Sequence, residues 1–115
     1  MLQKLDTEHL NRLALADALA SMEPRDFDMR RAHRCICGQA LRLFGRHSHY
    51  FGGWESQLSA GANLLGLSTD QARELFAPVN RAEHSDPYTH PQDAARVVRY
   101  LAATDTVDWR VAGKL

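Results

Sequence analysis

The sequence has few of the residues that could tie a small domain together covalently. It contains two cysteines in 115 residues, Cys35 and Cys37, and a single residue separates them. Two cysteines cannot build the disulfide framework that stabilises many small secreted domains. We therefore expect reduced thiols in a reducing compartment and a fold that depends on one modest hydrophobic core.

Long apolar runs and net charge are also missing. No segment approaches the uninterrupted apolar length of a membrane span, and charged residues such as Lys4, Asp6 and Glu8 interrupt the start of the chain, unlike a signal peptide. Lysine plus arginine (14) equals aspartate plus glutamate (14), so no overall field draws the chain to nucleic acid or to an acidic membrane. The sequence predicts a soluble, cytoplasmic protein with no membrane partner, and it leaves the oligomeric state open.

Helical periodicity is what the sequence does contain, and no segment is convincing as a strand. We expect a single all-α domain over residues 1–115, a compact bundle of about five helices with a helix-turn-helix-like corner. The tail from Thr104 to Trp109 is expected to lie extended across the bundle, with Trp109 as a plug. The predicted helices run from about Asp6 to Pro24, from Arg30 to Phe44, from Trp54 to Leu65, from Ser68 to Phe76, and from Pro91 onward.

The first and second predicted helices carry further expectations. The first has a broad apolar surface, which predicts contact with more than one neighbour. In the second, Gly38 indicates a close approach by another helix, because an interior glycine costs about 1 kcal/mol relative to alanine, and Gly45 is a natural stop. The apolar residues of the first helix are Leu10, Leu13, Ala14, Leu15, Ala18, Leu19 and Met22.

The corner between residues 59 and 76 is specified most fully. Gly66 supplies the left-handed residue that ends a helix, and Leu67 follows where a Schellman-type stop places its hydrophobic contact. Ser68 caps the next helix, and Gln71 completes a capping box. This corner resembles DNA-binding helix-turn-helix units. The second helix, however, presents the acidic residues Asp70 and Glu74 and only one basic residue, Arg73. DNA would therefore meet net repulsion, and a purely structural role of the corner is favoured.

Basic residues gather between residues 25 and 49. Arg30 and Arg34 are one helical turn apart, which predicts a basic ridge that could meet phosphate or an acidic protein surface. The alternative, given equal weight, is a solvated face paired with Asp26, Asp28 or the first helix. Exposed aromatic residues near arginine are typical of protein-binding hot spots, whereas Phe51 and Trp54 are expected to be buried. The predicted partner-binding residues are Arg30, Arg31, Arg34, Arg42, Arg46, Tyr50 and Tyr88.

Metal binding and catalysis are weaker hypotheses. His33 and Cys37 are four residues apart and could share a zinc ion, but the Cys-x-Cys and His-x-His spacings, the latter at His47 and His49, are unusual for ligands. Cys35 could be a nucleophile activated by a histidine, yet no oxyanion-hole motif or suitable scaffold accompanies it. We expect no catalytic residue, cofactor or metal, and retain a small zinc-binding protein as an alternative.

Several short segments resemble a set of small uncharacterised proteins of bacteria and their phages. They are Cys35 to Ala40, Leu65-Gly66-Leu67, Leu75-Phe76 with Pro78, and Val107-Asp108-Trp109. The resemblance implies a mobile-element origin and carries over no site residue. Together with the charge distribution, it gives the hypothesis of a non-catalytic interaction module. Such a module could be a phage protein that inhibits or regulates a host protein or nucleoprotein, as an anti-CRISPR does. The alternative is a helix-turn-helix regulator that binds nucleic acid directly.

Overall fold

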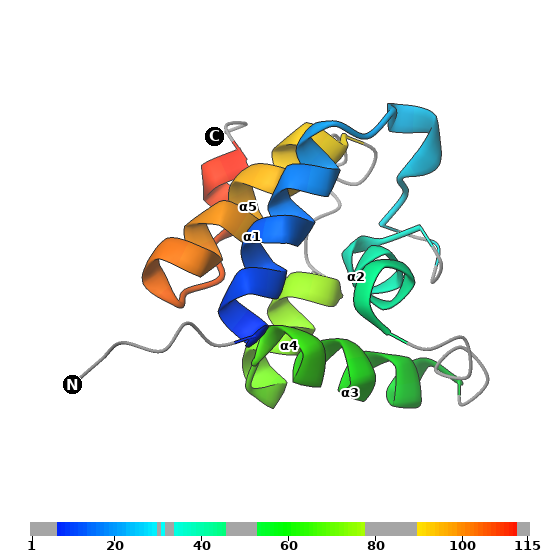
Figure 1. Ribbon diagram of the computed structural model, residues 1–115, viewed down its shortest axis with the longest axis vertical. Coiled ribbons are helices and arrows are strands. Elements are labelled where there is room, and N and C mark those ends of the chain that lie inside the picture. Colours follow the sequence, from blue (N-terminus) through cyan, green and yellow to red (C-terminus); the bar gives the residue numbers. More distant parts are fainter. Residues whose placement is uncertain (1–6, 30, 32–33, 46–52, 78–89, 113–115) are drawn as a thin grey trace.

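Five α-helices and two short 3-10 helices make up the fold in a computed structural model, which describes residues 7–29, 31, 34–45, 53–77 and 90–112 (Figure 1). No strand occurs in these ranges. The predicted all-α bundle of about five helices is therefore confirmed. In chain order the elements are α1 (Thr7–Ala20), η1 (Pro24–Asp26), α2 (Ile36–Phe44), α3 (Gly53–Leu65), α4 (Thr69–Phe76), α5 (Pro91–Thr104) and η5 (Trp109–Ala112).

Helix α1 is the centre of the packing. It lies along α5 on one side and contacts α3 and α2 on the other (Figure 1). The buried face of α5 carries Ala94, Val97, Val98 and Leu101 at helical spacing, all fully buried. The core thus joins helices from opposite ends of the sequence.

The apolar surface of α1 is narrower than predicted. Leu15 and Leu19 are fully buried, whereas Leu10 is 48% exposed, Leu13 is 42% exposed, and Ala14 is also exposed. The predicted contact with more than one neighbour is confirmed, because α1 packs against α5, α3 and α2, but part of the predicted apolar surface is exposed. The reason is that the buried side of the helix includes a charged residue, Arg12, which occupies room that an apolar pattern would assign to leucine.

Arg12, within α1, contacts the ends of two other helices. Its guanidinium donates hydrogen bonds to the carbonyl oxygens of Leu65 (2.7 Å) and Gly66 (3.0 Å), where α3 ends, and to that of Leu101 (3.3 Å) near the end of α5. It also donates to the Asp105 carboxylate at 3.0 Å. Positive charge at a helix C-terminus is favourable because it is attracted to the negative end of the helix dipole. Arg12 therefore ties α1 to the C-terminal ends of α3 and α5.

The corner between α3 and α4 forms as predicted. Gly66 has a φ of 66°, and the Leu67 amide donates to the Ala62 carbonyl at 2.9 Å, the bond that defines a Schellman stop. The Ser68 hydroxyl accepts from the Gln71 amide (3.1 Å), and the Gln71 side chain accepts from the Ser68 amide (2.8 Å). Gln71 also donates to the Asp105 carbonyl oxygen at 2.8 Å, so the capping box joins the Arg12 cluster.

Gly61 marks the closest approach of α3 to α2. A Cβ atom at this position would lie 2.7 Å from the Cys37 sulfur and 3.1 Å from the Phe76 ring. Such contacts leave no room for a larger residue without displacement of a neighbour. Glycine at position 61 therefore lets α3 lie directly against Cys37 and α4.

The predicted start of the second helix was wrong. Helix α2 begins at Ile36, with Cys35 as its N-cap, and not at Arg30. It does end at Gly45, whose φ of −92° is not left-handed. Residues 106–108 of the predicted extended tail have no regular secondary structure, and the 3-10 helix Trp109–Ala112 follows them. Trp109 is the predicted plug: it is 7% exposed, and its indole nitrogen donates to the Glu74 carbonyl at 2.9 Å.

Candidate partner-binding groove

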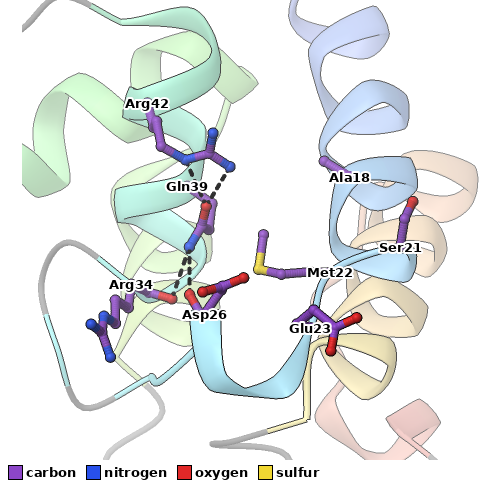
Figure 2. A pocket seen from close by; sticks show the side chains of 8 residues that line it. All are labelled: Ala18, Ser21, Met22, Glu23, Asp26, Arg34, Gln39 and Arg42. Atoms are coloured by element: carbon purple, nitrogen blue, oxygen red, sulfur yellow. Dashed lines mark hydrogen bonds between the residues drawn. The ribbon is translucent and has the colours of Figure 1, made fainter.

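A groove of about 560 Å³ lies between the C-terminal part of α1, η1 and α2 (Figure 2). Helix α1 ends at Ala20 and Pro24 begins η1, so the chain turns away from α1 before α2 runs back beside it. Except for Ala18, Met22 and Gln39, the lining residues are exposed. The lining consists of Ala18, Ser21, Met22, Glu23, Asp26, Arg34, Gln39 and Arg42.

Gln39 forms the wall on the α2 side. It is 4% exposed, and its amide nitrogen donates to the carbonyl oxygens of Asp26 and Arg34, both at 3.3 Å. A buried amide with these bonds is held in one orientation, with its oxygen directed toward Arg42. The two bonds also fix η1 and the start of α2 relative to each other.

The Gln39 oxygen holds the guanidinium of Arg42. It accepts from Nε at 3.1 Å and from Nη2 at 2.8 Å. These bonds use one edge of the guanidinium, so Nη1 and the outer hydrogen of Nη2 form an open edge without a partner in the described part of the chain. Figure 2 shows the group reaching from α2 toward α1. This open edge has the geometry that binds a carboxylate or phosphate in a bidentate manner.

A carboxylate lies in the same groove. Figure 2 shows Asp26 directed between α2 and Met22, with Arg34 turned to the outer side of its segment and Glu23 below Met22, turned away from Asp26. Neither Asp26 nor Glu23 lies within ion-pair distance of a cation among the described residues. The groove therefore combines the preorganised Arg42 guanidinium, the Asp26 carboxylate and the thioether of Met22, and Arg34 and Glu23 also line it.

Of the predicted arginine cluster, the structure describes Arg31, Arg34 and Arg42. Arg34 precedes the first turn of α2, so the prediction that Arg30 and Arg34 share a helix face was wrong. Arg31 lies 3.7 Å from the Asp28 carboxylate. Arg34 and Arg42 are exposed and have no carboxylate within ion-pair distance in the described ranges. The other predicted partner-binding residues, Arg30, Arg46, Tyr50 and Tyr88, lie outside the described residues.

Trp54 corrects another expectation. It was predicted to be buried, but at the first turn of α3 it is 38% exposed. Phe51, predicted to be buried with it, lies outside the described residues.

Both cysteines are buried. Cys35 accepts from the Gly38 amide at 3.5 Å as the N-cap of α2, and the Cys37 thiol donates to the Gln57 carbonyl at 3.3 Å. Burial raises the pKa of both thiols, so both remain protonated near neutral pH. The histidines of the predicted zinc site, His33, His47 and His49, lie outside the described residues. Within those residues, no group of three or more metal-ligating side chains occurs.

The exposed surface of α4 has the mixed charge that its sequence predicted. Asp70, Arg73 and Glu74 are all exposed, next to Thr69. The helix therefore offers one cation and two carboxylates at the corner that resembles a helix-turn-helix unit.

Three residues that organise the structure were not identified from the sequence: Gln39 and Asp26, which line the groove, and Arg12, which lies outside it. A polar residue inside an otherwise apolar helical run was the available signal for Gln39, which interrupts the run from Ile36 to Leu41. Arg12 follows Asn11 between Leu10 and Leu13, so no such signal marked it. Asp26 had been considered only as a possible ion-pair partner of the arginines.

The fold defines a small all-α protein with an open, charged surface groove. No helix in the described ranges is long and apolar enough to cross a membrane. No family model matches the chain, and neither does any curated protein or solved structure.

Proposed function

We propose that this protein is a non-catalytic interaction module that binds another macromolecule through the groove between α1 and α2. The observation that carries the proposal is the guanidinium of Arg42, which Gln39 holds by two hydrogen bonds while its outer edge stays open to solvent. A cation fixed in this way loses little conformational entropy when it binds an anionic group.

Arg34 extends this basic surface on the outer side of the segment before α2. Both guanidinium groups are exposed and are not neutralised by a carboxylate within the described part of the chain. Exposed arginines of this kind steer an anionic partner and contribute to specificity. The burial of both thiols supports a role in binding over thiol catalysis. The sequence resemblance to phage-type proteins supports a more specific proposal, that the partner is a host protein and that binding regulates or inhibits it.

The test is retention of partners from bacterial lysates on the immobilised protein. We expect Arg42→Glu and Arg34→Glu to reduce retention of a defined partner, while Arg73→Glu, an equal charge change on the exposed surface of α4, leaves it intact. Circular dichroism of each variant verifies the fold. If both groove variants keep every partner of the native protein, the proposal is wrong.

A gel shift with random duplex DNA at low salt tests the alternative of a DNA-binding regulator. Binding that Arg73→Glu abolishes and Arg42→Glu leaves unchanged would assign function to α4 instead of the groove.

A further inference from the structure

We infer that the groove recognises a polypeptide segment of mixed charge, with an acidic side chain placed against Arg42 and a basic side chain placed against Asp26. This inference rests on the proposed function and specifies the chemistry of its partner. It depends on two opposite charges that share one groove, neither of which has an ion-pair partner among the described residues.

The acidic side chain would bind the open edge of Arg42. Because Gln39 is buried and its own amide is bonded to two backbone carbonyls, the guanidinium cannot turn freely. Its Nη1 and Nη2 atoms are left to form parallel hydrogen bonds with the two oxygens of a carboxylate. A lysine at this position would supply the positive charge but not the two parallel hydrogen bonds.

The basic side chain would bind Asp26. The Asp26 carbonyl is fixed by Gln39, so the backbone from which its carboxylate projects is held in place. Figure 2 shows this carboxylate on the groove side of η1, near Met22. Met22 is half-buried and flexible, and its thioether can adapt to the aliphatic stem of a lysine or arginine.

A uniformly charged partner fits this groove poorly. Nucleic acid would place phosphates near Asp26 and Glu23 as well as near Arg42, and like charges at close range oppose binding. The exposed lining also differs from the enclosed pockets that cover most of a small ligand's surface. An open groove with alternating charge instead suits a segment of a protein surface or an extended peptide.

The experiment uses an array of synthetic twelve-residue peptides in four groups: mixed acid and base, acidic only, basic only, and uncharged. We expect the native protein to prefer the mixed group and Arg42→Lys to bind that group several-fold more weakly. Asp26→Arg should shift the preference to acidic peptides, and Arg42→Glu should shift it to basic ones. A shift toward a new group is a gain of binding that an unfolded variant would not show.

Two surface variants serve as controls of equal charge change. Asp70→Arg matches Asp26→Arg, and Arg73→Glu matches Arg42→Glu; both positions are exposed on α4, away from the groove lining. We expect both controls to keep the preference of the native protein for the mixed group.

Several results would overturn the inference. Preference of the native protein for acidic peptides or for duplex DNA, lost in Arg42→Glu, would disprove mixed-charge recognition and leave the proposed function intact. If the protein binds none of the four peptide groups but its binding of a lysate partner still depends on Arg42, mixed-charge recognition is likewise disproved and the proposed function stays intact. If neither peptides nor lysate partners respond to changes at Arg34 and Arg42, both proposals fail.

Discussion

Replacement of Arg12 by methionine tests whether a single buried guanidinium holds the bundle together. Methionine keeps most of the aliphatic stem and removes four hydrogen bonds, those to the carbonyl oxygens of Leu65, Gly66 and Leu101 and to the Asp105 carboxylate. The variant thus isolates the contribution of the charged head from that of packing.

The expected magnitude follows from the burial of these bonds. The bond to Leu65 is buried, and loss of its donor leaves a helix-end carbonyl without compensation, at a cost of about 1–3 kcal/mol. The bonds to Gly66 and Leu101 add about 0.5–1.5 kcal/mol each. The Asp105 carboxylate is 72% exposed, so its ion pair contributes roughly 0.2–1 kcal/mol. We therefore expect a loss of about 2–7 kcal/mol from the free energy of unfolding, which is a large part of the roughly 5–15 kcal/mol of a typical domain.

Urea unfolding, followed by circular dichroism and by tryptophan fluorescence, measures this loss. The matched control is Arg99→Met. Arg99 is an exposed residue of α5 that pairs with Asp17 of α1 on the surface. The control should lose less than about 1 kcal/mol. The reasoning is refuted if Arg12→Met is no less stable than Arg99→Met.

Three further predictions concern packing, thiols and pH. Gly61→Ala should lower the free energy of unfolding in urea by about 1–3 kcal/mol, because the new Cβ would lie 2.7 Å from the Cys37 sulfur. Adding Cys37→Ala should recover part of that loss, and an equal loss with and without Cys37→Ala would contradict the contact. The two buried thiols should react with Ellman's reagent only as fast as the protein unfolds, and immediate modification of the folded protein would disprove their burial. Hydrogen bonds from Gln71 and Arg12 lower the pKa of Asp105. The native protein should therefore be more stable than Asp105→Asn at a pH above the ordinary pKa range of a carboxyl group, and this advantage should fade as the pH falls through the lowered pKa. A stability difference that does not depend on pH would contradict this prediction.

The local stops and caps of the fold could be predicted from the sequence because each depends on a few neighbouring residues. Gly66 ends α3 and Ser68 caps α4 through bonds that span no more than five residues. The buried stripe of α5 was predictable for the same reason, since helical spacing alone places its apolar residues on one side.

The errors had both local and long-range causes. The start of α2 was misplaced because Arg30 to Arg34 has a helix-compatible composition, whereas Cys35 is the residue that caps the helix. Leu10 was included in the broad apolar surface of the first helix because an isolated helix gives no sign that Arg12 fills the buried side. The groove was missed because Asp26 and Arg42 come together only through the buried amide of Gln39.

The pairing of α1 with α5 has a consequence for how the protein is made in the cell. The two helices are separated by about 70 residues of chain, so α1 leaves the ribosome long before the partner that covers it has been translated. Until then the apolar side of α1 is without its main cover, and exposed apolar surface of this kind favours aggregation or capture by a chaperone. Completion of the fold should therefore coincide with release of α5, and a nascent chain arrested before Pro91 should remain sensitive to protease.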